Sequence, residues 1–243
     1  MTISHRTKST WHAVIVACAL ALPGHAAVIA NGGFEAGLSS WTVADQLGSE
    51  GTFFVQLGTT SPVNGTTVPA PPEGIRAAMS DAQGPGSHVL YQDFTVTGSI
   101  PAAILVFDLF IGNRDTDFFA PNSLDFSTPA LDQQVRVDLL VGGSAPFSVA
   151  ATDLLMNLYQ THPGDPLVSG YKQISVDITS VINGHLNTPL RLRFAEVDNV
   201  LTQQLGVDNV DIVASPVPEP STFLALSFLL LAGACLRRSS QYR

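Results

Sequence analysis

The central part of this chain predicts an all-β fold, an antiparallel β-sandwich. Short runs rich in β-branched and aromatic residues recur between residues 27 and 214, and Gly, Pro, Asn or Asp bound each of them. Strand-like runs separated by such turn residues are typical of sandwiches. No hydrophobic period of 3.6 residues is sustained over the same stretch, which argues against a helical domain.

Seven runs are the expected strands. The clearest is the fourth, in which apolar and charged residues alternate, so Val135, Val137 and Leu139 should face one side of a sheet and Arg136 and Asp138 the other. In chain order the expected strands are Gly51–Leu57, Ser87–Val96, Ala102–Ile111, Gln133–Val141, Tyr171–Ile178, Pro189–Glu196 and Leu205–Val213.

The segments between these strands predict two short helices and two long loops. Asp153–Gln160 and Thr179–Leu186 are the candidate helices, and Thr179 is a suitable N-cap residue for the second. Gly58–Gly74 is rich in Thr, Pro and Gly and should be irregular. Asn113–Ala130 is long for a hairpin connection, and long ordered loops often carry function.

The N-terminus has the layout of a secretory signal peptide at residues 1–26. An uninterrupted apolar run, Ala13–Leu22, follows a basic segment without acidic residues. Pro23-Gly24 ends the run, and small residues precede Ala27, so cleavage is expected after Ala26. The basic residues are His5, Arg6 and Lys8.

A second interpretation of this end rests on Ile15–Cys18, which resembles a lipobox. It would make Cys18 the lipidated first residue of the mature protein. The apolar run continues past Cys18 to Leu22, and the apolar stretch before Cys18 is very short. Cleavage after Ala26 is therefore the preferred prediction.

The C-terminus carries a short apolar run between a Pro-Glu-Pro triplet and paired arginines. Thr222–Leu236 has no charged residue and, as a helix, would span about 22 Å at ~1.5 Å per residue. A hydrocarbon core is about 30 Å thick, so this helix would be a marginal anchor. A buried C-terminal core helix is the alternative, but the run is not amphipathic. The flanking residues are Pro218, Glu219 and Pro220 before the run, and Arg237 and Arg238 after it.

This C-terminal arrangement resembles the PEP-CTERM sorting signal of exported Gram-negative proteins. The resemblance implies that residues 215–243 are a brief linker plus a sorting tail, with a basic end at residues 237–243. It also implies a partner, an exosortase-type membrane protease that cuts at the Pro-Glu-Pro site. The protein would be anchored transiently in the inner membrane and then reach the cell envelope, the surface or the extracellular matrix.

The region between the two ends, residues 27–214, is one strongly acidic domain. It holds nineteen acidic and six basic residues, and such a surface repels nucleic acid, so no nucleic-acid partner is expected. The two cysteines, Cys18 and Cys235, lie outside this domain, which excludes disulfides and thiolate chemistry within it. Many Asp residues suit turns and also suit calcium.

The two ends of this domain resemble carbohydrate-binding jelly rolls of the galactose-binding-like class. The opening Asn31–Glu35, followed by Leu38 and Trp41, is similar to the start of such modules. The closing strands carry the other fragments of the resemblance, which are Val176–Ile178, Leu190–Phe194 and Val207–Val210. The resemblance implies that first and last strands lie close together. It also implies a structural Ca²⁺ held by Glu35 and Asp208.

Motifs of catalysis are absent from the sequence. It has no Gly-x-Ser-x-Gly elbow, no His-Glu-x-x-His pair and no phosphate-binding glycine loop. The histidines of the domain, at positions 88, 162 and 185, are isolated from one another. Glu73 and Glu196 would form a glycosidase pair only at a defined separation that a sequence does not show. The expectation is a protein that is not an enzyme.

The loop Asn113–Ala130 holds the remaining candidate binding residues. Asn113, Asp115 and Asp117 resemble the start of an EF-hand, but Phe118 replaces the required Gly and Leu124 the required Glu. A looser calcium contact through Asp115 and Asp117 stays open. Phe118 and Phe119 lie among polar residues of this loop, which makes them candidate platforms for stacking a sugar ring.

Three functions follow from these observations. The preferred one is a non-catalytic exported protein of the envelope or extracellular matrix, associated with glycan or exopolysaccharide. The second is a structural or adhesive surface protein that binds no sugar. The third is a hydrolase whose motif is not recognised.

Overall fold

The computed structural model describes residues 28–128 and 130–215, which form ten strands and one short helix. The expected signal peptide and the expected apolar tail helix lie outside the described residues. The first elements are β1 (Thr42–Asp45), β2 (Thr52–Leu57), β3 (Arg76–Asp81), β4 (Gly86–Thr95) and β5 (Ala102–Asn113). The others are β6 (Gln133–Val141), β7 (Leu154–Gln160), β8 (Lys172–Asp177), α1 (Thr179–Gly184), β9 (Pro189–Asp198) and β10 (Gln203–Ser215).

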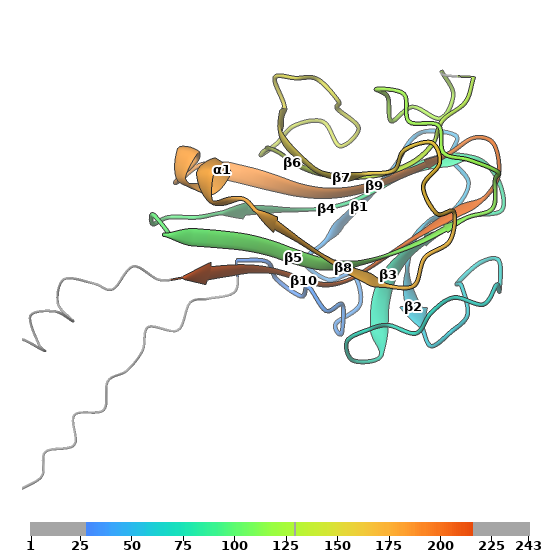
Figure 1. Ribbon diagram of the computed structural model, residues 1–243, viewed down its shortest axis with the longest axis horizontal. Helices are drawn as coiled ribbons and strands as arrows, with labels where there is room; N and C mark the ends of the chain where they lie inside the picture. The colour runs from blue at the N-terminus through green and yellow to red at the C-terminus, as the bar shows by residue number, and fades with distance from the viewer. Residues whose placement is uncertain (1–27, 129, 216–243) are drawn as a thin grey trace, which may run out of the picture.

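The strands form two five-stranded antiparallel sheets that stack face to face (Figure 1). Sheet A has the strand order β1-β4-β9-β6-β7, and sheet B has the order β2-β3-β10-β5-β8. Every pairing between neighbouring strands is antiparallel. The predicted fold class, an antiparallel β-sandwich, is therefore confirmed.

Strands β3 to β10 have the connectivity of a jelly roll. β3 pairs with β10, β4 with β9, β5 with β8 and β6 with β7, so the first four strands form a ribbon with the last four. The ribbon closes on itself because β10 also pairs with β5, and β9 with β6. β1 and β2 add one strand to an edge of each sheet. This connectivity is what the sequence resemblance implied.

Aromatic side chains connect the segment before β1 to both sheets. The ring of Trp41 lies 5.3 Å from that of Phe34 and 5.9 Å from that of Phe194 in β9. Phe194 in turn meets Phe107 of β5 edge to face, with centroids 5.4 Å apart. Aromatic pairs of this kind contribute about 0.5–1.5 kcal/mol each beyond the area that they bury. The opening segment is thus part of the core.

The outer face of sheet A carries a buried ionic cluster. Arg136 and Asp138 point away from the core, as the alternation in β6 predicts, but both are buried. Asp138 accepts hydrogen bonds from Arg136 and from the fully buried Arg193 of β9. The loop at residues 142–153 lies over them, and two of its carbonyls accept from Arg193 Nη1 at 2.7 and 2.8 Å.

All seven expected strands are present, and their ends differ from the predictions by at most two residues. The expected helix at Asp153–Gln160 is wrong, because this segment forms β7 and pairs with β6. Without β7, β6 would be an edge strand with unpaired amides, and that cost outweighs the weak helix preference of Leu and Met. Sequence reasoning also misses β1 and β3.

The expected helix at Thr179–Leu186 is confirmed as the shorter α1, but Thr179 is not its N-cap. The cap position is Ile178, which makes no side-chain capping bond. Thr179 Oγ1 instead accepts a hydrogen bond from the Ala103 amide at 2.9 Å, which ties α1 to the start of β5.

The long loop between β2 and β3 is fixed over sheet B by one buried carboxylate. Asp81 Oδ2 accepts hydrogen bonds from the amides of Val63 and Asn64 at 2.7 and 2.9 Å. Burial opposes the charge of Asp81, but these amides and Gln204 hold its pKa below the usual value. The loop is irregular, as predicted, but its hydrogen bonds to Asp81 hold it against β3.

Candidate functional site: an edge cleft and an end pocket

Cavities of about 440, 340 and 220 Å³ lie among the described residues. Sites for small molecules commonly measure about 300–1,000 Å³, so the largest of these three cavities is the first candidate. The cavity of 340 Å³ lies on the outer side of sheet A and includes Phe147 and Asp125. The carboxylate of Asp125 accepts hydrogen bonds from Gln46, Ser127 and Thr128. This cavity therefore offers a ligand fewer unpaired polar groups than the cavity of 440 Å³.

The largest cavity, named the edge cleft, lies along the edge strands β7 and β8. The register of β8 against β5 places Lys172 opposite Leu109, and that of β7 against β6 places Tyr159 opposite Val137. Leu109 and Val137 face the core, so both strands turn these cleft residues towards the space between the sheets. The lining is Leu109, Ile111, Tyr159, Gln160, His162, Asp165, Pro166, Ser169, Lys172, Gln173 and Ile174.

The segment that connects β7 to β8 closes one side of the edge cleft and is held by hydrogen bonds to β5. The Ser169 amide donates to the Ile111 carbonyl at 2.9 Å, and the Ile111 amide donates to Ser169 Oγ at 3.0 Å. Closer to β7 in this segment, the Gly164 amide donates at 2.7 Å to Oδ1 of Asp117, in the loop after β5. These hydrogen bonds hold one wall of the edge cleft in place.

Several polar groups of the edge cleft have no partner among the residues that the structure describes. They are the hydroxyl of Tyr159, the ammonium of Lys172 and the side-chain amide of Gln173. Burial raises the pKa of Tyr159, and the charge of Asp165 adds to the shift, so the hydroxyl stays protonated at neutral pH. Beside the apolar Leu109, Ile111 and Ile174, these groups can contact a ligand that is both apolar and rich in hydroxyls.

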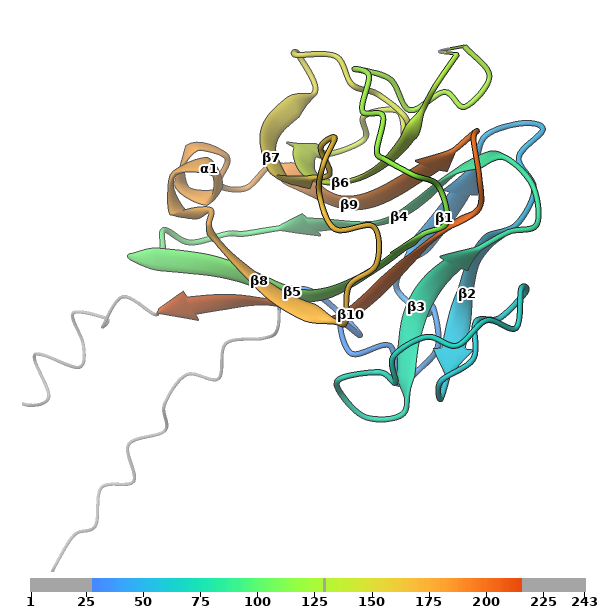
Figure 2. The ribbon, with the colours of Figure 1, turned by 45° about the vertical axis from the view of Figure 1, so that its right-hand side comes forward.

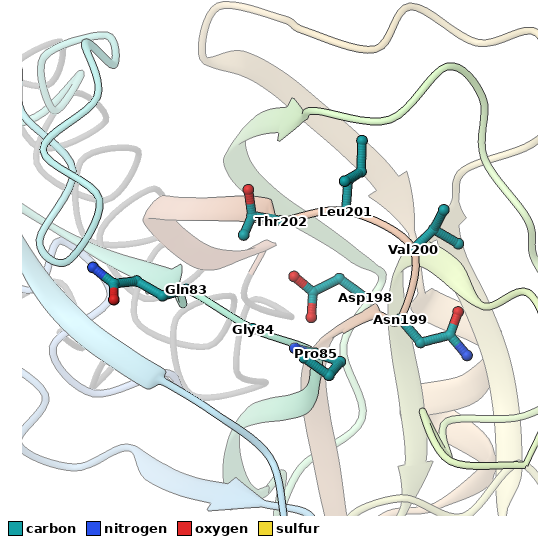
Figure 3. A pocket seen from close by; sticks show the side chains of 8 residues that line it. All are labelled: Gln83, Gly84, Pro85, Asp198, Asn199, Val200, Leu201 and Thr202. Atoms are coloured by element: carbon teal, nitrogen blue, oxygen red, sulfur yellow. The ribbon is translucent and has the colours of Figure 1, made fainter.

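The smallest cavity, named the end pocket, lies between the loops at residues 82–85 and 199–202 (Figure 3). Asp198 extends into the space between these loops. Its Oδ1 accepts a hydrogen bond from the Gly86 amide at 2.9 Å, and its Oδ2 accepts one from the Gln203 amide at 3.0 Å. Asp198 therefore joins the two loops, and burial raises its pKa to about 6.

Two further ionisable groups are buried beside Asp198. Glu196 lies two residues earlier on β9, on the same inward face, and its cross-strand neighbour is His88 of β4. Burial, and then the charge of Asp198, raises the pKa of Glu196 well above its usual value, which favours the protonated form of this side chain. His88 Nδ1 lies 2.7 Å from Asp45 Oδ1. Glu196 Oε1 and His88 Nε2 have no partner among the described residues.

The buried side chains of Asp198, Glu196 and His88 do not form an acid–base pair that a substrate can reach. Glu196 is not part of the lining of the end pocket, and both oxygens of Asp198 bind backbone amides. A general acid or base must reach the substrate within a hydrogen bond. Glu73, the other member of the glycosidase pair considered above, lies in the loop before β3 and next to Asp208, not beside Glu196. The sequence held no signal for the cluster around His88, because it depends on strand register.

The structure brings Glu35 and Asp208 to the same turn but not to each other. Glu35 Oε1 accepts hydrogen bonds from the amides of Ile75 and Arg76 at 2.8 and 2.9 Å, which lower its pKa. Asp208 Oδ2 accepts one from the Glu73 amide at 3.1 Å. The two carboxylates thus hold the turn at residues 73–76 from both sides.

The opening motif lies against the last strand, as the resemblance implied. The Val210 amide donates to the Gly32 carbonyl at 3.0 Å. A Cβ atom at Gly32 would lie 1.8 Å from the Val210 carbonyl oxygen, so only glycine fits there. Asn31 donates to the carbonyls of Gly37 and Ser39 and fixes the turn that follows.

The carboxylates around the turn at residues 73–76 provide only part of what a Ca²⁺ site requires. Burial raises the pKa of Asp208 to about 7, and the charges of Glu73 and Asp108 add to the shift, a repulsion that a cation would relieve. The side chain of Glu73 makes no hydrogen bond among the described residues, so it is free to bind an ion. Within those residues, however, no group of three His, Cys, Asp or Glu side chains is arranged to hold a metal ion.

The loop after β5 places the other expected residues differently. Phe118 is fully buried and belongs to the core, so the expectation that it stacks on a sugar is wrong. Phe119 is partly exposed, and its backbone pairs with Gln133. Asp117 Oδ1 binds the amides of Phe118 and Gly164, and this is a structural contact. Loop residues become core here because the loop returns over the end of the sandwich.

A family model, the PEP-CTERM protein-sorting motif, matches residues 216–239. The chain carries this sorting signal. The match includes the expected cleavage residues and both expected arginines, all of which lie outside the described residues. The PEP-CTERM motif implies export and processing by an exosortase at the membrane, followed by a location at the surface. In the described part of the chain, no helix has the length and apolar character to cross a membrane.

Comparison with solved structures finds β-sandwich neighbours at low similarity. TmCBM61, solved with β-1,4-galactotriose, has 12% identity and a TM-score of 0.42 over 78% of this chain and 99% of its own. The cellulose-specific carbohydrate-binding module CBM28 has 13% identity and a TM-score of 0.41, over 75% and 92%. A Stig cyclase from Fischerella sp. TAU has 18% identity and a TM-score of 0.45, over 79% and 98%. No curated protein matches the chain.

Proposed function

We propose that this PEP-CTERM protein is a non-catalytic component of the cell envelope or extracellular matrix that binds polysaccharide in the edge cleft. One observation supports the proposal most. The cleft combines an apolar floor, a partly buried tyrosine and polar groups that have no partner within residues 28–128 and 130–215, in a volume of about 440 Å³.

This combination matches the chemistry of a sugar chain. A pyranose ring has apolar faces that pack against aromatic or aliphatic side chains, and its hydroxyls both donate and accept hydrogen bonds. Tyr159 lies beside the apolar floor, and its hydroxyl can donate. Lys172 donates only, whereas Gln173 does both. A neutral, hydroxyl-rich ligand satisfies these groups without bringing a net charge to an acidic protein.

The test is retention by polysaccharide. Wild-type protein and the variants Tyr159→Ala and Gln83→Ala are run in affinity gels and on a glycan array. Gln83 is exposed and lies in the end pocket, so its variant is a matched control. A ligand contact of about 1.4 kcal/mol lost from Tyr159 lowers affinity about tenfold. Binding by wild type and Gln83→Ala, with loss in Tyr159→Ala, supports the proposal.

Two other results would decide against it. If no polysaccharide is retained by any variant, the protein is better described as a structural or adhesive surface protein. If wild type cleaves a chromogenic glycoside and one carboxylate substitution abolishes the turnover, it is a hydrolase. Equal binding by all three variants would place the sugar site outside the edge cleft.

A further inference from the structure

The last strand leaves the sandwich at one defined end. Ser215, the last residue of β10, pairs with Ala102, the first residue of β5. The next residue of β5, Ala103, exchanges hydrogen bonds with Ile178 and Thr179 at the start of α1. Figures 1 and 2 show the end of β10, the start of β5 and α1 on the same side of the molecule. This side is named the α1 end.

The chain between the α1 end and the apolar run is short. The sorting motif begins at residue 216, directly after β10, and the uncharged run begins at Thr222. The seven Cα–Cα steps from Ser215 to Thr222 span at most about 25 Å when fully extended. The twelve residues of β5 alone are about 40 Å long, at ~3.4 Å per residue. An apolar run held in the bilayer therefore keeps the α1 end within about 25 Å of the membrane, whereas the opposite end is free to lie up to ~40 Å farther away.

The charge distribution fits this orientation. Three connections lie at the α1 end, and two of them, residues 96–101 and 178–188, contain no Asp, Glu, Lys or Arg. The third, residues 142–153, carries one charged residue, Asp153, whose carboxylate accepts a hydrogen bond from Ser148 Oγ. Asp177, the acidic residue nearest to the first two along the chain, accepts a hydrogen bond from the Thr179 amide. The loops at the opposite end carry most of the acidic residues of the connections, including Glu50, Asp115, Asp117, Asp125, Asp132 and Asp165. Anionic lipid repels such loops more strongly than a surface of low charge.

The surface of the α1 end is polar and firmly held. Ser99 and Ser180 are exposed, whereas Ile100 and Ile182 are buried beneath them. The Ile100 amide and carbonyl both bind the side chain of Asn183, at 3.1 and 2.9 Å. None of the large apolar side chains of residues 96–101 and 178–188 is exposed, and the nearest exposed ones are Val141 and Val213 at strand ends. A mainly polar surface of this kind suits contact with lipid headgroups and not insertion among the acyl chains.

We propose that, while the sorting tail is anchored, the α1 end lies against the bilayer surface and the loops around the end pocket face away from it. The short connection sets the orientation, and the low charge of the α1 end permits it. The Pro-Glu-Pro site then lies between the folded domain and the membrane, where a membrane protease reaches it. The proposal rests on the sorting motif and is independent of sugar binding.

Energy transfer to a membrane acceptor tests this orientation. The full chain, with Cys18 and Cys235 changed to Ser, is purified from a host without the processing protease and placed in phosphatidylcholine–phosphatidylglycerol vesicles that contain a fluorescent acceptor lipid. A donor dye is attached at Ser180→Cys in one sample and at Gln83→Cys, at the opposite end, in the other. We expect transfer to be at least about twofold more efficient from position 180, because transfer efficiency falls steeply over the ~40 Å of the sandwich.

Equal transfer from the two positions, or a chain that does not associate with the vesicles, would overturn the proposal. A second variant carries a 20-residue Gly-Ser insertion after Ser215, and the difference between the positions should disappear in it, because a flexible linker removes the restraint. A difference that persists in this variant would contradict the claim that the short connection sets the orientation.

Discussion

Arg193 lies fully buried against Asp138, with its Nη2 atom 2.6 Å from Asp138 Oδ2, on the outer face of sheet A. Asp138 also accepts hydrogen bonds from Arg136 and from the side-chain amide of Asn157, so one carboxylate accepts from three side chains. Burial opposes the charge, but the two guanidinium groups hold the pKa of Asp138 below its usual value. The pair of Arg193 and Asp138 explains how the twelve-residue loop at residues 142–153 stays fixed over the outer face of sheet A.

Asp138→Asn should therefore destabilise the domain strongly. It leaves two buried guanidinium groups without a charged partner, a change that costs about 3–5 kcal/mol. Urea denaturation measures the difference in the free energy of unfolding. Asp93→Asn is the control, because Asp93 binds Arg191 but is 40% exposed, and its loss should cost about 1 kcal/mol or less. Equal effects of the two substitutions would contradict the central role of Asp138.

Stability should rise as the pH falls from 8 to 5. Burial raises the pKa of Asp132 and Asp208 to about 7 and that of Asp198 to about 6. The unfolded chain loses these protons near pH 4, so between pH 4 and 7 the folded state binds more protons and unfolding releases them. The free energy of unfolding then decreases as the pH rises through this window. One pKa unit corresponds to about 1.4 kcal/mol, so even part of the shift is measurable.

Urea denaturation at pH 5, 6 and 8 checks this dependence. Asp132→Asn should make it flatter, because asparagine mimics the protonated acid in a fully buried position. Below pH 4 the trend should reverse, because Asp81 and Asp138 have lowered pKa values and lose their favourable contacts when protonated. A stability that rises steadily from pH 5 to pH 8 would show that the buried acids are charged in the folded state.

The sequence predicts the strands that alternate and misses those decided by tertiary pairing. Val135, Val137 and Leu139 define β6 because their spacing is a local property. β3, Arg76–Asp81, contains small residues and Met and resembles no strand, yet five of its six residues are buried between the core and the loop that covers sheet B. β7 has no alternation and interrupts its pairing with β6 at two irregularities.

The site was less predictable than the fold, for the same reason. Tyr159 lies in a segment expected from the sequence to form a short helix, and only its pairing with Val137 turns it inward. Lys172 is an ordinary surface lysine until the register places it opposite Leu109. The ends of the domain were more informative, because the glycine at position 32 records a close approach to Val210 that no other residue permits.

Substitution at the sorting motif should change the fate of the protein without changing its fold. Glu219→Gln or Pro220→Ala should leave the tail uncut and the protein in the inner membrane, because residues 216–239 match the processed motif. Membrane fractionation and mass spectrometry of the intact protein measure both effects. Ser221→Ala, just outside the triplet, is the matched control and should be processed normally. Unchanged processing of both triplet variants would contradict the role of the triplet.

Calcium is the remaining proposal, and thermal unfolding tests it. We propose that Ca²⁺ binds where Glu35, Glu73 and Asp208 surround the turn at residues 73–76, since a cation relieves the repulsion that adds to the raised pKa of Asp208. Millimolar Ca²⁺ should then raise the melting temperature, because a ligand that binds only the folded state stabilises it by mass action.

The informative variant is Glu73→Gln, because the side chain of Glu73 makes no hydrogen bond in the described part of the chain, and its loss should leave the metal-free protein unchanged. It should weaken the calcium shift, whereas Glu50→Gln, at the opposite end of the sandwich, should retain it. Mg²⁺ at equal ionic strength controls for general screening of an acidic surface. Equal shifts of the melting temperature with both ions, or no shift in wild type, would contradict the calcium proposal. Glu35 and Asp208 would then serve only to accept amide hydrogen bonds. That result would agree with the absence, in the described residues, of a group of three side chains that could hold a metal ion.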